Sequence, residues 1–254
     1  TWNPTLMEDL GVLLAEESIA KGAHVLLAPT INLHRNPLGG RNFECYSEDP
    51  YLTGTLAAGY INGVQSQHVA VTAKHFVAND SEFERNSIDS QVDERTLREV
   101  YLLPFEHAVK DGNAWGIMSS YNRINGTFAS EHEWLLKTVL REQWGFDGFV
   151  VSDWFAARST GPSIKAGLSL EMPGKGQWYG PERIIEAIEN DECTESELDE
   201  IVKDMLRLMQ RTNAFNGVGG GEEKQIDRPE HRELIRHAAT CLLYTSDAAD
   251  DRLS

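Results

Sequence analysis

The sequence predicts an α/β fold with a parallel sheet, and two observations support this prediction. Helix-like and strand-like segments alternate from the first residue to about Asn213, which is the pattern of consecutive βα units. The strand-like runs are short and almost continuously apolar, which indicates strands buried on both faces. With 254 residues, of which 41% are hydrophobic and 25% charged, the chain is large enough to bury a full core.

The first expected element is a helix that begins at Asn3-Pro4, a favourable cap and first-turn pair, with Leu6, Leu10 and Leu13 on one face. Five short runs rich in β-branched and apolar residues are expected to be strands: 24–29, 69–74, 116–120, 148–152 and 168–172. Helices are expected between them, at 53 to about 65 and in two segments of 94–110 that are split by a proline.

A further helix is expected after Ser130, with a capping box to Glu133 and with Gly145 at its end. Beyond the last strand, the residues predict a pair of helices at 181–190 and 195 to about 212. A capping box of Thr194 and Glu197 begins the second of these.

Four regions are expected along the chain. Residues 1–213 form a first domain, and the glycine-rich residues 214–229 form a linker. Residues 230–240 are the start of a truncated second domain, whose first helix is cut off soon after Arg228-Pro229-Glu230. Residues 241–254 resemble translated adaptor sequence from library preparation, and we expect this tail to be non-native.

The composition excludes several kinds of partner. A net charge of −17 disfavours binding to nucleic acid or to anionic lipid, because a negative surface repels both. No apolar run is long enough to span a membrane. The three scattered cysteines have neither disulfide-framework nor metal-ligand spacing, so neither a disulfide framework nor a zinc site is expected. No cofactor is expected. No secretion signal is visible and the chain begins without Met, so both a cytoplasmic and a secreted protein remain open.

Polar residues follow four of the predicted strands, where a parallel barrel would carry its reactive groups. Taken singly, each has an ordinary explanation, because a Lys-His pair is often structural and an Asp after a strand often caps a helix. Their occurrence at corresponding positions indicates a site. In strand order they are Asn32, His34, Arg35 and Arg41; Lys74-His75; Tyr121-Asn122; and Asp153-Trp154.

The residue types suit a polyhydroxylated ring, whose hydroxyls need hydrogen-bond partners and whose C–H face needs an aromatic wall. The donors are Arg41, Lys74, His75 and Arg85, and the aromatic partner is Trp154. Cations around Asp153 favour its ionised form, so this carboxylate can attack or stabilise an oxocarbenium-like centre.

Five ordered motifs closely resemble glycoside hydrolase family 3, and the resemblance extends over residues 1 to about 240. They are Leu38-Gly-Gly-Arg-Asn-Phe-Glu44 with Ser47-Glu-Asp-Pro50; Lys74-His-Phe-Val-Ala-Asn79; Asp93-Glu-Arg-Thr-Leu-Arg-Glu99; Met118-Ser-Ser-Tyr-Asn122 with Asn125-Gly126; and Gly145-Phe-Asp-Gly-Phe-Val-Val-Ser-Asp-Trp154. The combination is far more specific than any one of them.

The resemblance implies an incomplete TIM-type (β/α)8 barrel over 1–213, normally followed by an α/β-sandwich domain. It implies hydrolysis of terminal non-reducing β-D-glucosyl residues with retention, through a glycosyl intermediate on Asp153. The implied substrate-binding residues are Arg41, Lys74, His75, Arg85, Met118, Tyr121 and Trp154. Among them Tyr121 donates to the nucleophile, while Met118 and Trp154 form walls.

The resemblance also implies that two parts lie outside this chain. The family carries a sugar-binding Asp in a loop after an early strand, and a catalytic acid/base Glu in the second domain. Glu44, Glu48 and Asp49 are carboxylates near the site, but the motif suggests that they orient Arg41 and close a loop. The isolated chain is therefore expected to be nearly inactive, because a retaining glycosidase needs two carboxyl groups.

Several alternatives remain open. A hexosaminidase branch of the family uses a His in the loop after the Lys-His strand, but residues 79–86 contain none, which favours the glucosidase branch. A β-xylosidase or another exo-acting glycosidase of the family remains possible. A Schiff-base aldolase that uses Lys74 belongs to another class of enzyme. The isolated chain is also compatible with an inactive carbohydrate-binding barrel, or with a piece that misfolds because its strand edges are open.

Overall fold

Helices and short strands alternate along most of the described chain. The computed structural model describes residues 2–174, 176–217 and 222–245, with side chains through residue 241. Its α-helices are α1 (Pro4–Ala20), α2 (Pro50–Gln65), α3 (Glu94–Thr96), α4 (Leu103–Lys110), α5 (Gly161–Ala166), α6 (Pro181–Glu189), α7 (Glu195–Arg211) and α8 (Pro229–Thr245). The segments η1 (Asn42–Glu44), η3 (Ala129–Glu131) and η5 (Ala214–Asn216) are 3-10 helices, while η2 (Leu97–Tyr101) and η4 (Trp134–Gln143) are π-helical.

The strands are β1 (Val25–Leu26), β2 (Ala70–Val71), β3 (Ala73–Phe76), β4 (Asp89–Ser90), β5 (Gly116–Ser119), β6 (Arg123–Ile124), β7 (Thr127–Phe128) and β8 (Phe149–Ser152). The sheets β1–β2 and β3–β5–β8 are wholly parallel, follow the order of the chain and together make up the main sheet, while β4, β6 and β7 form a separate sheet. Strand β1 pairs with β2, and β5 lies between β3 and β8, all in parallel. A parallel bridge between Thr30 and Lys74 continues the first pair toward β3.

The predicted α/β class is confirmed, but the described residues show no closed sheet. The expected fifth strand, 168–172, is reduced to a single parallel bridge between Leu170 and Val151. Its backbone is held partly by a side chain, because the Val150 N–H donates to Ser169 Oγ at 3.1 Å. The apolar pattern alone therefore overestimated this strand.

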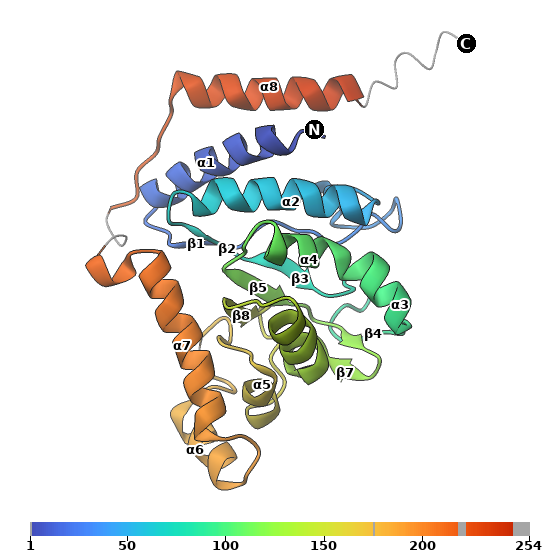
Figure 1. Cartoon of the computed structure of the whole chain (residues 1–254), viewed down its shortest axis with the longest axis vertical. Coiled ribbons are helices and arrows are strands. Elements are labelled where there is room, and N and C mark those ends of the chain that lie inside the picture. The colour runs from blue at the N-terminus through green and yellow to red at the C-terminus, as the bar shows by residue number, and fades with distance from the viewer. Residues whose placement is uncertain (1, 175, 218–221, 246–254) are drawn as a thin grey trace.

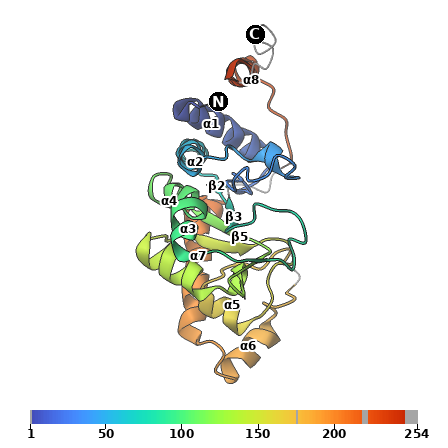
Figure 2. The ribbon, with the colours of Figure 1, turned by 90° about the vertical axis from the view of Figure 1, so that its right-hand side faces the viewer.

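Helices α1 and α2 lie side by side above the sheet, with α8 beyond α1 (Figures 1 and 2). The α1–α2 contact is close because α2 has glycines on the shared face. A Cβ atom at Gly63 would lie 2.0 Å from the carbonyl oxygen of Glu8, so no larger residue fits without separating the helices. Helix α7 lies on the other side of the molecule, beside β8.

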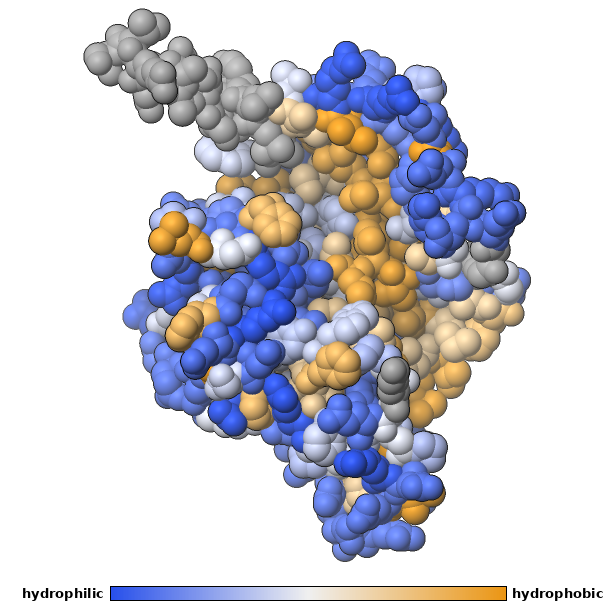
Figure 3. Space-filling model, turned by 180° about the vertical axis from the view of Figure 1, so that it is seen from behind, coloured by the Kyte–Doolittle hydropathy of each residue, from blue (hydrophilic) through white to orange (hydrophobic). Residues whose placement is uncertain are grey.

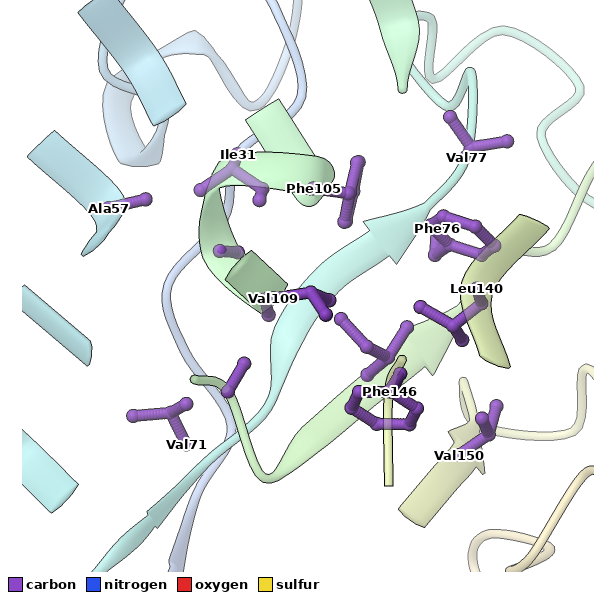
Figure 4. Packing of buried hydrophobic residues seen from close by; sticks show 14 of the residues in the cluster. Ile31, Ala57, Val71, Phe76, Val77, Phe105, Val109, Leu140, Phe146 and Val150 are labelled. Atoms are coloured by element: carbon purple, nitrogen blue, oxygen red, sulfur yellow. The ribbon is translucent and has the colours of Figure 1, made fainter. Parts of the chain in front are cut away.

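The main core lies between the sheet and helices α2, α4 and η4 (Figure 4). Phe76 on β3 meets Phe105 on α4 edge-to-face, with ring centroids 5.1 Å apart, and Trp144 at 6.2 Å. All three rings are buried, and Leu140 of η4 belongs to the same cluster. This packing fixes β3 at Phe76, the residue directly after His75, which the sequence places in the site.

Most of the predicted helix ends are confirmed. Asn3 accepts hydrogen bonds from the first turn of α1, and the capping box of Thr194 and Glu197 begins α7. Gly145 has a positive φ of 74° at the end of η4. Helix α2 begins earlier than expected, because Asp49 caps it by accepting the N–H of Leu52 at 3.0 Å.

The predicted capping box of Ser130 and Glu133 is wrong. Ser130 lies in the 3-10 turn η3, and its hydroxyl donates to the carbonyl oxygen of Ala156 at 3.0 Å. The helix η4 begins only at Trp134. The Ser130 hydroxyl therefore bonds to Ala156, which is distant in the sequence, and does not cap the helix as the local pattern predicted.

The last helix is longer than expected, since α8 extends from Pro229 to Thr245, into the segment that the sequence assigned to a non-native tail. Glu16 of α1 holds its start, because it accepts from Arg228 at 2.7 Å and contacts His231 at 2.9 Å. Residues 218–221 of the expected linker and 246–254 of the expected tail lie outside the described residues.

A small second sheet was not anticipated from the sequence. Strand β4 pairs in parallel with β6, and β6 forms an antiparallel hairpin with β7 around Asn125-Gly126. The amide of Asn122 connects this sheet to the end of β3, because its Nδ2 lies 3.2 Å from the Val77 carbonyl and 3.3 Å from the hydroxyl of Ser90. The loop between β3 and β4 is thereby held next to the end of β5.

A band of apolar surface lies on the face opposite that of Figure 1 (Figure 3). Separately, a second apolar cluster is centred on Met118, Phe149 and Val151, and several side chains around it are only partly buried: Val25, Leu27, Leu170, Met172 and Met205. Among the described helices, none has the length and apolar character needed to cross a bilayer.

Candidate active site

Asp153 lies directly after β8 and is buried, with 8% of its surface exposed. Its own N–H donates to the carbonyl oxygen of Ser119 at 3.2 Å, which ties it to the end of β5. Its carboxylate oxygen Oδ1 accepts the backbone N–H of Trp154 at 2.7 Å. The carboxylate is therefore oriented by the backbone, and its second oxygen faces other strand ends.

His75 lies beside that second oxygen, with Nε2 at 3.5 Å from Asp153 Oδ2. Asn32 holds the residue in place. Its Oδ1 accepts the backbone N–H of His75 at 2.8 Å and lies 3.2 Å from Nδ1, while its Nδ2 donates to the His75 carbonyl at 3.0 Å. Burial, together with the cations Arg41, Lys74 and Arg85, lowers the pKa of His75 well below its usual value.

Arg41 connects His75 to a carboxylate. Its Nη1 lies 3.0 Å from His75 Nε2, and its Nε donates to Glu44 at 2.5 Å. Glu44 also accepts the hydroxyl of Thr30 at 2.6 Å, so the predicted contact of Glu44 with Arg41 is confirmed. Burial lowers the pKa of Lys74, and Arg41 acts in the same direction against the opposing effect of Glu44 and Asp153. Lys74 is therefore within the electrostatic reach of both carboxylates.

Tyr121 and Arg85 form the other side of the cluster. Burial, the negative charge of Asp153 and a side-chain hydrogen bond with Asp153 raise the pKa of Tyr121 to about 12. Its phenol therefore stays protonated at neutral pH and donates to the carboxylate. The guanidinium of Arg85 lies over the Tyr121 ring, 4.8 Å from its centroid, and pairs with Glu82 at 2.5 Å.

The two expected walls differ in exposure. The Trp154 side chain follows Asp153 and is 37% exposed, so its ring is available to a ligand. Met118 lies within β5, is only 2% exposed, and packs in the cluster with Phe149 and Val151. Contacts or charge effects thus place six of the predicted residues around Asp153: Arg41, Lys74, His75, Arg85, Tyr121 and Trp154.

A cavity of about 780 Å³ lies beside this cluster and not over it. Its walls come from 35–40, 80–83 and 88–96, so it shares Glu82 and Gly40 with the surroundings of Arg41 but contains neither Asp153 nor His75. We therefore centre the site on Asp153, where the chemistry-bearing groups converge. Within the described residues, no group of three or more His, Cys, Asp or Glu side chains is arranged to hold a metal ion.

Two residues with clear positional roles were not assigned from the sequence. Asn32 was noted as a polar residue after the first strand, but its pairing with His75 joins residues far apart in the chain. Glu82 pairs with Arg85 and also lies 4.0 Å from Arg41. The spacing of three residues between Glu82 and Arg85 is the sequence signal that indicates this pair.

Comparison with known proteins shows the same family along most of the chain. The family model described as the glycosyl hydrolase family 3 N terminal domain matches residues 1–208. A beta-glucosidase of Rhizobium radiobacter is 54% identical over 93% of this chain, and beta-glucosidase B of Emericella nidulans is 46% identical over the same share. The chain spans 29% and 28% of the length of these two relatives.

Solved structures agree with this result. The beta-glucosidase of Kluyveromyces marxianus superimposes with a TM-score of 0.90 at 40% identity, over 93% of this chain and 29% of that one. Beta-glucosidase 3B of Thermotoga neapolitana, in complex with α-D-glucose, gives a TM-score of 0.87 at 44% identity, over 93% of this chain and 34% of that one. With the fold, the strand-end residues and the family match in agreement, this chain belongs to glycosyl hydrolase family 3.

Proposed function

We propose that this chain is the nucleophile-bearing part of a retaining β-glucosidase, which hydrolyses terminal non-reducing β-D-glucosyl residues. The observation that carries the proposal is the buried Asp153 carboxylate at the end of β8, with Tyr121 and the Trp154 N–H as donors. The names of the relatives support the substrate class, and the α-D-glucose in the Thermotoga neapolitana structure supports a glucose-sized site.

In the proposed first step, Asp153 attacks the anomeric carbon and forms a glycosyl ester while the bond to the leaving-group oxygen breaks. That oxygen takes a proton from a general acid. In the second step the same group, now a base, takes a proton from water, which attacks the anomeric carbon and releases Asp153 as a carboxylate. Two inversions at one carbon give net retention.

The general acid is proposed to come from a part of a longer protein, since the chain spans less than a third of the first relatives. The carboxylates close to Arg41 are already held by other side chains, because Glu44 binds Arg41 and Thr30 while Glu82 binds Arg85. The 254-residue chain alone is therefore expected to turn over substrate very slowly. In the longer protein we propose that residues 1–213 form part of a (β/α)8 barrel, which is followed by a sandwich domain that starts at about residue 230.

The cations around Asp153 are proposed to hold the sugar hydroxyls. Arg41 and Lys74 provide donors on one side of the carboxylate and Arg85 on the other, with His75 between them. The exposed ring of Trp154 is proposed to cover the apolar face of the sugar or of the aglycone. Met118 is proposed to support the base of this pocket from β5.

The test is covalent labelling of the longer protein that contains this chain. A 2-deoxy-2-fluoro-glucoside with a good leaving group should add the mass of one fluoroglucosyl group to the peptide that contains Asp153. D153N should abolish both the label and the hydrolysis of aryl β-glucosides. D147N is a matched control, because Asp147 lies before the same strand but is paired with Arg211 at 2.8 Å, away from the site.

A label on another carboxylate of an active enzyme would contradict the assignment of Asp153. Parallel assays with an aryl β-xyloside test the substrate class. A higher kcat/KM for the xyloside than for the glucoside would replace β-glucosidase by β-xylosidase and leave the nucleophile unchanged.

A further inference from the structure

We propose that Asn32 is a positioning residue that fixes His75 as the neutral Nδ1–H tautomer, so that the bare Nε2 accepts from Arg41 and the Asp153 carboxylate faces no imidazolium. The proposal rests on the proposed function for its catalytic consequence, but the position of the proton follows from the geometry alone. Asn32 and His75 are both buried, with 5% and 2% of their surfaces exposed.

The orientation of the Asn32 amide is settled by the backbone of His75. A backbone N–H can only donate, so the atom 2.8 Å from it is the amide oxygen. A carbonyl oxygen can only accept, so the atom 3.0 Å from the His75 carbonyl is the amide nitrogen. Flipping the amide would place donor against donor and acceptor against acceptor between two buried residues.

The fixed amide decides which imidazole nitrogen carries the proton. The same Asn32 oxygen lies 3.2 Å from Nδ1 of His75, and an oxygen that only accepts requires Nδ1 to donate. On the other side of the ring, Arg41 Nη1 lies 3.0 Å from Nε2. A guanidinium has donors only, so Nε2 must be the acceptor. The ring is therefore neutral, with one proton, on Nδ1.

The charged groups that face the ring favour this state on balance. Arg41, Lys74 and Arg85 oppose a positive charge on His75, whereas Asp153, at 3.5 Å from Nε2, would favour it. The chain of contacts continues from Arg41 to Glu44 and returns to Thr30, two residues before Asn32. The contacts therefore form a series that starts at Asn32 and ends at Thr30, and both of these residues follow the first strand. Its members in order are Asn32, His75, Arg41, Glu44 and Thr30.

This arrangement matters for Asp153. A second proton, on Nε2, would make the ring an imidazolium that points toward Asp153 Oδ2 and repels the N–H of Arg41, so the guanidinium would move and the nucleophile would acquire an ion pair. An ion-paired carboxylate is a weaker nucleophile. By holding the proton on Nδ1, Asn32 keeps Arg41 in place and keeps the Asp153 carboxylate free of an ion pair with His75.

The direct test is neutron diffraction from deuterated crystals of the longer protein at neutral pH. We expect deuterium on Nδ1 of His75 and none on Nε2. Deuterium on Nε2, or on both nitrogens, would overturn the proposal. This measurement requires no turnover, so a failure of the proposed β-glucosidase activity would be recognised separately, as an absence of hydrolysis by the wild type.

The kinetic test is N32D. Its carboxylate still accepts from Nδ1 but favours the imidazolium, so the acid limb of kcat/KM should move to higher pH by about one pKa unit or more, a loss of about tenfold on that limb. N125D is the matched control, because the Asn125 amide pairs in the same way with the backbone of Val92, at 2.9 and 2.8 Å. It should keep the wild-type profile, and an unmoved acid limb in folded N32D would contradict the proposal.

Discussion

The Nε2 atom of His75, which lies in β3, is 3.5 Å from Oδ2 of Asp153, which directly follows β8. The other carboxylate oxygen is occupied by the backbone N–H of Trp154 at 2.7 Å. The orientation of Asp153 therefore depends on contacts from β3, β5 and β8 together, and changes to its neighbours should alter catalysis without removing the nucleophile.

Y121F should lower kcat by about 10- to 100-fold. The change removes the hydrogen bond from the phenol to the Asp153 carboxylate, and a hydrogen bond to a charged group contributes about 1.5–3 kcal/mol. Steady-state kinetics with an aryl β-glucoside give the comparison. Y101F is the control, since the Tyr101 phenol binds Arg35 beside the separate cavity. Equal losses in both variants would mean that the Asp153 contact is unimportant.

E44Q should lower kcat/KM by about five- to thirtyfold, mainly through KM. Glu44 fixes Arg41 by a contact of 2.5 Å. Without this charged contact, the orientation of Arg41 loses about 1–2 kcal/mol of stabilisation, so Arg41 should bind the sugar less tightly. E99Q removes the charge of another Glu that binds an arginine Nε, at 3.0 Å on an exposed helix surface. Kinetics of E99Q should match the wild type, and the idea fails if E44Q does so too.

Asp80 should make stability depend on pH between about 4 and 6. Burial raises its pKa to about 6 from the usual 3.8 of an aspartate, despite the hydrogen bond from Leu33 N–H, so the folded state binds this proton more tightly than the unfolded state. The stabilisation by this proton is then fully present below about pH 4 and is lost as pH rises through about 6, by roughly 3 kcal/mol.

The measurement is urea unfolding of D80N and of the wild type across this range of pH. Asn cannot titrate but still offers an oxygen to Leu33, so the free energy of unfolding of D80N relative to the wild type should rise with pH. A difference that stays constant from pH 4 to 7 would show that Asp80 titrates as in the unfolded chain.

F105A should destabilise the fold by about 3–5 kcal/mol, because Phe105 is fully buried and meets Phe76 edge-to-face at 5.1 Å. F215A should change the free energy of unfolding by about 0.5 kcal/mol or less, since Phe215 is 59% exposed. Chemical denaturation of both variants gives the comparison. A small effect of F105A would mean that the core between α4 and the sheet rearranges to fill the space.

Local patterns determined much of the fold. The caps at Asn3 and Thr194 and the helix end at Gly145 were predicted because each depends on residues a few positions apart. The strand positions followed from apolar runs, and the polar residues at their ends identified the groups that meet at Asp153. Where a residue finds a distant partner, as Ser130 does with Ala156, the local pattern failed.

The sequence by itself determined the α/β class, the family resemblance and the identity of the candidate nucleophile, because these depend on spacing and residue type. Only the tertiary structure decided which side chains touch it, how the sheet is ordered, and that Asn32 holds His75. Those contacts join strand ends far apart in the chain, and the direction of each hydrogen bond depends on partners that no local pattern specifies. The pairing of Asn32 with His75 arises because parallel strands bring their carboxyl ends to one edge.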